Sequence, residues 1–319
     1  MVLSRKTRTS LFRKLVEKEW REYFWEFVLK YSDKLDWYYI SSNPNITMEF
    51  IEKYPDKPWN WDSISYNPNI TMDIIEKHPD KAWDWNGISR NPNITMEFIE
   101  KYPDKSWNWD SISCNPNITM DIIEKYSDKP WNWGGIAYNP NITMDIIEKY
   151  PDKPWNWNAI SCNPNITMDV IEKYPDKPWY WTGISCNPNL TMDIIENNLD
   201  KPWDWNSLSY NPNITWEIIL YNLDKPWNWY AISNNPNITM DIIETNLNKP
   251  WSWYNISCNP FNYEKELFIE KRMKEYLAAY RIQQIWNRVL SDPYYHIGFR
   301  KLYRDYDKLF TDDCRIKCY

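Results

Sequence analysis

The sequence predicts an all-α fold, an α-solenoid (superhelix) of stacked two-helix repeats with a helical cap at each end. A 24-residue unit and a recurring Trp-x-Trp pair, first seen at Trp59 and Trp61, lead to this prediction. The pairs hold 18 of the 23 Trp. A fixed period in this range is typical of units that bury their apolar faces only against neighbours. The units open with Asn-Pro at ten evenly spaced asparagines: Asn43, Asn67, Asn91, Asn115, Asn139, Asn163, Asn187, Asn211, Asn235 and Asn259.

The first element of each unit is predicted to be a short α-helix. In the unit that starts at Asn139, the proline that follows disfavours helix, so the chain turns there. Thr143 lies where an N-cap belongs, and Asp145 places a negative charge in the first turn, where the helix dipole favours it. A helix over 144–150 follows, and Pro151 ends it.

The second element is predicted to be another short helix, over about 153–161, with Asp152 as its N-cap. It carries Trp155, Trp157 and Ile160. Trp157 and Ile160 share one face at the i,i+3 spacing, and Trp155 points toward a neighbouring repeat or toward the surface. The sequence leaves open whether this element is an α-helix or a 3₁₀-helix.

Three segments are expected along the chain. Residues 1–42 form an N-terminal helical cap with a degenerate repeat, residues 43–258 form nine repeats, and residues 259–319 form a C-terminal helical cap and tail. In the tail, one long helix is expected over 264–290 and a shorter one over 297–309. The array is expected to be open and elongated, roughly 80–100 Å long at about 9–10 Å per layer.

The repeats change along the array. The early units match as 48-residue blocks, whereas from Asn187 onward the Lys-Tyr-Pro that ends the first helix drifts to Asn197-Asn198-Leu199. This pattern indicates a scaffold that has lengthened by duplication, not one built around a fixed active site.

Charge and composition narrow the function classes. Residues 43–262 carry a net charge of −13, whereas the segments before and after them carry +3 each, which together give the net charge of −7. An acidic body is a poor match for a phosphate backbone. The start of the chain lacks the apolar core of a signal peptide, and no stretch is apolar enough for a membrane helix. The protein is therefore expected to be soluble and intracellular.

The chemistry-bearing residues predict that the protein is not an enzyme and holds no metal or cofactor. His78 fills a slot that is tyrosine in most repeats, and no Gly-rich segment could hold a phosphate. His296, Cys314 and Cys318 have the wrong spacing for a metal site. Of the six Cys, four recur at one repeat position and are expected to be free thiols, because equivalent atoms in adjacent layers lie too far apart for a disulfide.

Two slots four residues apart in the second helix vary from repeat to repeat, so they share one helical face on a constant frame. This variable stripe is predicted to bind a protein partner, and the alternative is that it is unconstrained surface. A second alternative is single-stranded nucleic acid, stacked on the Trp and Tyr side chains. The stripe comprises Asp62, Tyr66, Asn86, Arg90, Asp110, Cys114, Tyr138, Asn158, Cys162, Thr182, Cys186, Asn206, Tyr210, Tyr230, Asn234 and Tyr254.

The Asn-Pro-Asn turn, Thr cap, Ile-Ile helix and 24-residue period resemble the leucine-rich repeat variant, although that family is aliphatic where this chain has Trp-x-Trp. The run from Asn139 to Trp157 is more similar to Trp-rich repeat proteins of giant DNA viruses of amoebae. The tail, with Ala279 to Trp286 and then Asp292-Pro293, resembles tails of such viral proteins. The resemblance implies a place in the host cytoplasm, the viral factory or the virion. Ile282-Gln283 followed by Arg288 only faintly resembles a calmodulin-binding motif.

Overall fold

A computed structural model describes residues 5–291 of the chain, and within that range it contains 21 helices and no strand. The predicted all-α repeat fold is confirmed. The described chain divides into two units, one of residues 5–20 with 266–291 and one of residues 21–265. The helices α1 (Arg5–Lys30) and α21 (Asn262–Ser291) contribute to both units, and all other helices belong to the second.

The first helix of each repeat forms as predicted. In the repeat that starts at Asn139 it begins after Thr143 and ends at Lys149, and the next residue, Tyr150, is its C-cap. The hydroxyl of the equivalent threonine accepts a backbone N–H in six of the repeats, for example Thr167 from Val170 at 3.4 Å. These helices are α3 (Met48–Lys53), α5 (Met72–Lys77), α7 (Met96–Lys101), α9 (Met120–Lys125), α11 (Met144–Lys149), α13 (Met168–Lys173), α15 (Met192–Asn197), α17 (Trp216–Tyr221) and α19 (Met240–Thr245).

The second helices begin later than predicted and are α-helices. They are α2 (Trp37–Ser42), α4 (Trp61–Ser65), α6 (Trp85–Arg90), α8 (Trp109–Ser113), α10 (Trp133–Tyr138), α12 (Trp157–Cys162), α14 (Trp181–Cys186), α16 (Trp205–Leu208), α18 (Trp229–Ile232) and α20 (Trp253–Cys258). The prediction that Asp152 caps this element was wrong. Asn156 is the N-cap of α12, and its side-chain oxygen accepts the N–H groups of Asn158 and Ala159. The indole of Trp155 donates to the carbonyl of Tyr150 at 2.9 Å and so fastens the turn of residues 151–153 that precedes it.

A ladder of buried asparagines joins each repeat to the previous one. The side-chain amide of Asn139 donates to the backbone carbonyls of Asn115 at 2.7 Å and Ile118 at 2.9 Å. Its side-chain oxygen accepts the N–H of Asn141, which closes the Asn-Pro-Asn turn. Asn139 is fully buried, so the ladder satisfies backbone groups that would otherwise be buried without partners. The same contact to the asparagine 24 residues earlier recurs at all nine asparagines from Asn67 to Asn259.

Paired indoles form a second ladder. Trp157 of one repeat and Trp179 of the next meet edge to face, with ring centroids 5.2 Å apart and an interplanar angle of 86°. This is the geometry that aromatic rings prefer. The ammonium of Lys177 lies 5.3 Å from the Trp157 ring centroid. The Trp-x-Trp residues therefore pack between repeats, with both indoles of each pair half-buried in most repeats.

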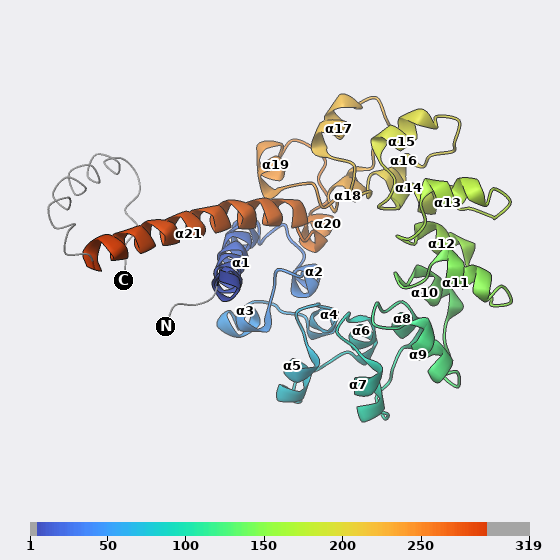
Figure 1. Cartoon of the computed structure of the whole chain (residues 1–319), viewed down its shortest axis with the longest axis horizontal. Coiled ribbons are helices and arrows are strands. Elements are labelled where there is room, and N and C mark those ends of the chain that lie inside the picture. Colours follow the sequence, from blue (N-terminus) through green and yellow to red (C-terminus); the bar gives the residue numbers. More distant parts are fainter. Residues whose placement is uncertain (1–4, 292–319) are drawn as a thin grey trace. The chain divides into compact units, whose positions relative to one another are not determined.

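The second unit closes on itself. Its second helices form an inner layer from α2 to α20 and its first helices an outer layer, and α2 packs against both α4 and α20 (Figure 1). The side-chain amide of Asn43 donates to the carbonyls of Ser257 and Asn259, both at 3.0 Å. The N–H of Asp36 donates to the Ser257 hydroxyl at 2.8 Å. The repeat array is therefore a closed ring, and the junction of α2 with α20 is its seam.

The seam reproduces the contacts of the other junctions. Asn67 bonds Ser41 and Asn43 in the way that Asn43 bonds Ser257 and Asn259. Asn43 and Asn259 are 216 residues apart, which is nine periods of 24 residues, and their contact forms the tenth junction of the ring. The ring thus contains ten repeat positions, of which the degenerate first copy supplies one. The expectation of an open, elongated array was wrong, because the small rotation between neighbouring repeats adds up to a full turn.

A half-buried carboxylate lies near the seam. Glu264 accepts the N–H of Met240 at 2.7 Å and the hydroxyl of Tyr23 at 3.2 Å. Burial raises the pKa of Glu264 above its ordinary value, and the charges of Asp241 and Glu244 add to this rise, whereas the two hydrogen bonds oppose it. The ionised form therefore costs free energy in the folded protein.

We expect Glu264→Gln to change how the stability of the ring depends on pH. Because the folded pKa is raised, the contribution of Glu264 is fully present below the unfolded pKa and is lost as the pH rises through the folded pKa. The free energy of unfolding of the natural protein should therefore fall relative to that of the variant as the pH rises above about 4.5. Urea unfolding of both proteins across this range measures the difference, and parallel curves would contradict the prediction.

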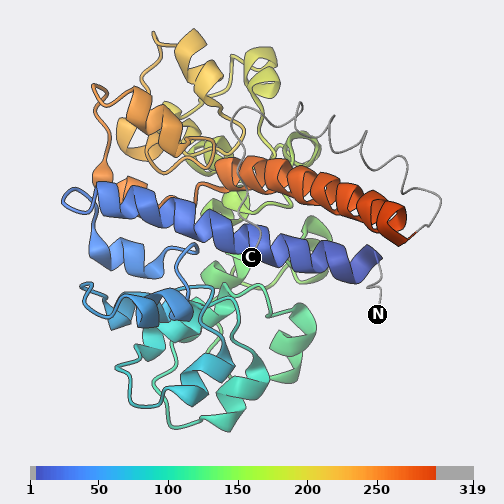
Figure 2. The same cartoon turned by 90° about the vertical axis from the view of Figure 1, so that its left-hand side faces the viewer.

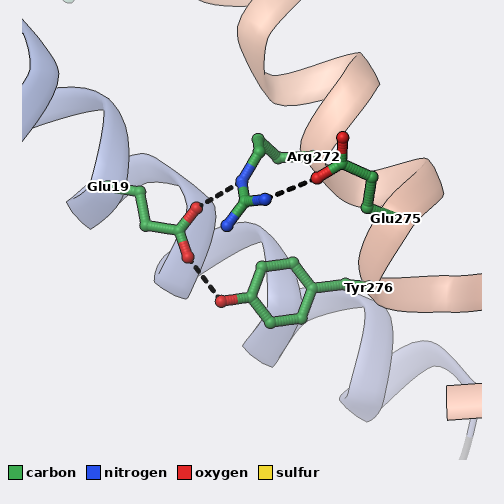
Figure 3. Close-up of polar contacts among 4 residues, drawn as sticks. All are labelled: Glu19, Arg272, Glu275 and Tyr276. Atoms are coloured by element: carbon green, nitrogen blue, oxygen red, sulfur yellow. Dashed lines mark hydrogen bonds and ion pairs between the residues drawn. The ribbon is translucent and has the colours of Figure 1, made fainter. Parts of the chain in front are cut away.

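The first unit is a pair of long helices that lie side by side (Figure 2). Trp20 is fully buried and packs edge to face on Phe268 at 5.6 Å. The guanidinium of Arg272 donates to Glu19 at 2.7 Å and to Glu275 at 2.5 Å (Figure 3). Burial opposes the ionisation of Glu19, but the hydrogen bonds from Arg272 and Tyr276 outweigh it and lower the pKa of this carboxyl. The predicted long helix over 264–290 is confirmed as α21, whereas the helix predicted over 297–309 lies outside the described residues.

Candidate interaction surface

The variable stripe belongs to the second helices, which form the inner layer of the ring, and its members are exposed or half-buried. Each second helix buries its middle residues, such as Ala159, Ile160 and Ser161 of α12, and leaves the two stripe positions on either side of them outside the core. Asn158 is exposed and Cys162 is half-buried. Because the ring is closed, the stripe continues from the last repeat to the first. Its members on neighbouring second helices lie close enough to contact one another.

On one side of the ring the stripe is a polar network. The side-chain amide of Asn86 donates to the hydroxyl of Tyr66 at 3.2 Å, and the amide of Asn108 donates to the oxygen of Asn86 at 2.5 Å. The guanidinium carbon of Arg90 lies 6.0 Å from the Tyr66 ring centroid. A hollow of about 550 Å³ lies next to this network, and its lining includes Asn86, Asn108 and Asp110. These contacts hold the side chains in fixed positions, which suits specific recognition.

At the seam the stripe becomes a run of tyrosines. The rings of Tyr230 and Tyr254 stack with centroids 5.9 Å apart, and Tyr254 lies 4.2 Å from Tyr39 with the two hydroxyls in contact. Tyr39 in turn lies 5.0 Å from Tyr38. Tyr38 and Tyr39 were not among the predicted stripe residues. Tyr38 could have been predicted, because it lies one period of 24 residues before Asp62.

A pair of thiols lies farther along the stripe. Cys162 and Cys186 come from successive repeats and lie near each other and near Tyr138, and the thiol of Cys186 donates to the Gly183 carbonyl at 3.2 Å. The Cys186 and Tyr138 side chains lower the pKa of the Cys162 thiol to about 7, whereas Cys162 and burial raise the pKa of Cys186. The prediction of free thiols is confirmed for the four described cysteines, which also include Cys114 and Cys258.

The charge of the inner layer is mainly negative. Asp62 and Asp110 occupy stripe positions, and Asp36, Asp84 and Asp204 cap second helices next to it. The only basic stripe member is Arg90. The hydroxyl, amide and carboxylate oxygens of this inner surface can bind hydrogen-bond donors and cations. The negative charge of the carboxylates repels phosphates.

The other chemistry-bearing residues are dispersed. His78 is the C-cap of α5 and lies 3.7 Å from Glu52, in the slot that Tyr54 fills at the end of α3. Among residues 5–291 no three His, Cys, Asp or Glu side chains gather where they could hold a metal ion. His296, Cys314 and Cys318 lie outside the described residues. No helix in the described part of the chain is long and apolar enough to span a membrane.

Comparison of the chain with protein-family models, with curated proteins and with solved structures found no match.

Proposed function

We propose that the protein is a non-enzymatic scaffold whose ring presents the variable stripe to a protein partner. The observation that carries this proposal is the contrast between a constant frame and a changing inner surface. The asparagine and tryptophan ladders repeat around the ring, whereas no two repeats carry the same pair of residues at the two stripe positions. Conserved packing with diverse exposed side chains is how repeat proteins build extended binding surfaces.

A protein partner is favoured over single-stranded nucleic acid. Nucleic-acid platforms need free aromatic faces beside basic groups. In the ring, the indoles of the Trp-x-Trp pairs pack on one another, and lysines cover several of them, as Lys153 covers Trp133 at 5.0 Å. The inner surface carries carboxylates where a nucleic-acid platform carries lysine and arginine.

We place this scaffold in the setting that the sequence resemblance implies, a giant DNA virus of amoebae. It would then act in the host cytoplasm or the viral factory, or be packaged in the virion. The supporting residues are the Trp-rich unit from Asn139 to Trp157 and the tail from Ala279 to Trp286. Fractionation of purified particles with an antibody to the protein tests the packaging.

Affinity capture from infected-cell lysate, with and without nuclease, tests the proposed binding. The stripe variant Tyr138→Ala/Tyr210→Ala/Tyr230→Ala changes three exposed rings, and the control variant Lys125→Ala/Lys149→Ala/Lys173→Ala changes three outer-layer side chains. We expect a nuclease-resistant protein that the control retains and the stripe variant loses. Recovery of nuclease-sensitive nucleic acid, or of a protein that the stripe variant still binds, would refute the proposal.

A further inference from the structure

One outer helix of the ring breaks the repeat pattern at its exposed end. The first helices α3, α5, α7, α9, α11 and α13 all end in Glu-Lys, and α15 and α19 still carry the glutamate. The helix α17 ends instead in Leu220-Tyr221. Leu220 is 44% exposed and Tyr221 is 89% exposed, so these apolar side chains add nothing to the core of the ring.

Three leucines extend this apolar surface to the neighbouring repeats. Leu199, Leu223 and Leu247 occupy one slot in three consecutive repeats, and they are 76%, 59% and 51% exposed. In five of the six earlier repeats that slot is proline. The helices before these leucines, α15, α17 and α19, are neighbours in the outer layer (Figure 1). We call Leu199, Leu220, Tyr221, Leu223 and Leu247 the leucine rim.

The slot itself is exposed in every repeat, whether proline, serine or leucine fills it, and the residue before it changes in the last three repeats. In the earlier repeats the residue before this slot is an aromatic ring that packs near the helix, and the preceding lysine pairs with a neighbour, as Lys101 does with Glu76 at 2.7 Å. In the last three repeats that residue is asparagine, whose amide turns back to cap the helix, as Asn222 does by donating to the Ile218 carbonyl at 2.9 Å. The leucine that follows projects outward. Clustered exposed apolar side chains of this kind mark interaction surfaces.

The charge around the leucine rim defines what fits it. Residues 187–258 carry seven carboxylates outside the inner layer and three lysines. Lys201 pairs with Asp200, Lys225 with Asp224, and Lys30 with Glu244. The four other carboxylates are Asp193, Glu196, Glu217 and Asp241, and they leave the surface acidic. An apolar strip with an acidic border is complementary to a helix that has an apolar stripe with basic flanks.

We propose that the leucine rim is a docking surface for an amphipathic, basic helix of another protein. A helix of about 18 residues is about 27 Å long, so its apolar stripe extends past one repeat to the leucines of the neighbouring repeats. One apolar stripe can therefore contact successive leucines of the rim. A second copy of this chain fits less well, because two rims that meet would bring two acidic borders together. The proposal is independent of what the inner stripe binds.

The test uses the full-length protein and a designed peptide. The probe is a fluorescein-labelled helix of about 18 residues with Leu on one face and Lys on the other. The variant Leu220→Glu/Tyr221→Lys introduces the Glu-Lys pair that ends the first helix in six other repeats. It leaves the net charge unchanged, and the fold already contains this pair at equivalent positions. We expect fluorescence anisotropy to show that the variant binds the peptide at least about tenfold more weakly.

Two controls separate the rim from general electrostatic attraction. Glu148→Leu/Lys149→Tyr places the same pair in α11, where no leucines flank it, and should not strengthen binding. A peptide with Ser in place of Leu should bind the natural protein no more tightly than it binds the rim variant. Equal binding of the Leu/Lys peptide to the natural protein and the rim variant would overturn the proposal. So would a dimer of the natural protein, seen by sedimentation equilibrium, that the rim variant abolishes.

Discussion

A protein that lacks residues 139–162 is expected to fold its remaining repeats and to lose the seam between α2 and α20. In an open solenoid the loss of one internal repeat only shortens the stack, because every repeat keeps the same neighbours. In the ring, ten repeat positions share one full turn, so nine positions with unchanged junctions leave a gap about one repeat wide. The gap should open at the seam, because the backbone of the array links every pair of neighbouring repeats except the first and the last.

Backbone hydrogen exchange measures this outcome directly. The N–H groups of Asp36 and Asn45 report on the seam, because Asp36 donates to Ser257 and Asn45 belongs to the turn that Asn43 anchors on Asn259. We expect both to lose most of their protection in the shortened protein, whereas Asn69, in the equivalent turn of the next repeat, should keep it. If Asp36 and Asn45 stay protected, the remaining junctions have bent to close a smaller ring, and the curvature of a junction is not fixed by its ladders.

The repeat frame follows from the sequence because its causes are local. Thr143 is the N-cap residue of the first helix because it precedes Met144 and follows a turn that proline enforces, although its hydroxyl makes no cap hydrogen bond, whereas the equivalent Thr167 does. The buried middle of the second helix could likewise be predicted, since Trp157 and Ile160 share a face. The start of that helix could not, because the choice between Asp152 and Asn156 as N-cap depends on the indole of Trp155, which fastens the segment between them to Tyr150.

Closure of the ring could not be predicted from the period. It depends on a small rotation at each junction, which is set by how closely the second helices approach. At the junction of α12 and α14, a β-carbon on Gly183 would lie 2.8 Å from the Cys162 sulfur and 3.2 Å from the Ser161 β-carbon. A change of a few degrees there, multiplied around the array, separates a ring from an open superhelix. The variable stripe could be predicted from the sequence, but the contact between its first and last repeats could not.

The candidate surfaces were predicted to different degrees. The stripe follows from two slots at i,i+4 on one helix, a local relation that the register shows. The leucine rim was visible only as a drift at Leu199, and its meaning depends on exposure. The slot of Leu199 is exposed in every repeat, with an aromatic residue or asparagine before it, so the apolar surface arises from the change of proline to leucine at an exposed position.

The single substitution with the largest expected effect is Asn139→Ala. It removes the donors to the carbonyls of Asn115 and Ile118 and the acceptor of the Asn141 N–H, all at a fully buried position. The amide of Asn141 still reaches Ile118, and the Asn115 carbonyl keeps the N–H of Ile118, so the Asn141 N–H is the group left without a partner. A buried polar group without a partner costs about 1–3 kcal/mol and each lost hydrogen bond about 1 kcal/mol, so we expect a loss of about 2–4 kcal/mol in the free energy of unfolding.

Two further alanine substitutions turn this measurement into a test of the ring. Asn141→Ala changes the same residue type in the same turn, but its amide bonds the carbonyl of Pro116 at a more exposed site, so its loss should be about 1 kcal/mol. Asn43→Ala removes the ladder contact at the seam. If the ring is closed, urea unfolding should show nearly the same loss for Asn43→Ala as for Asn139→Ala. In an open array Asn43 would have no repeat before it to bond, and its loss should be no larger than that of Asn141.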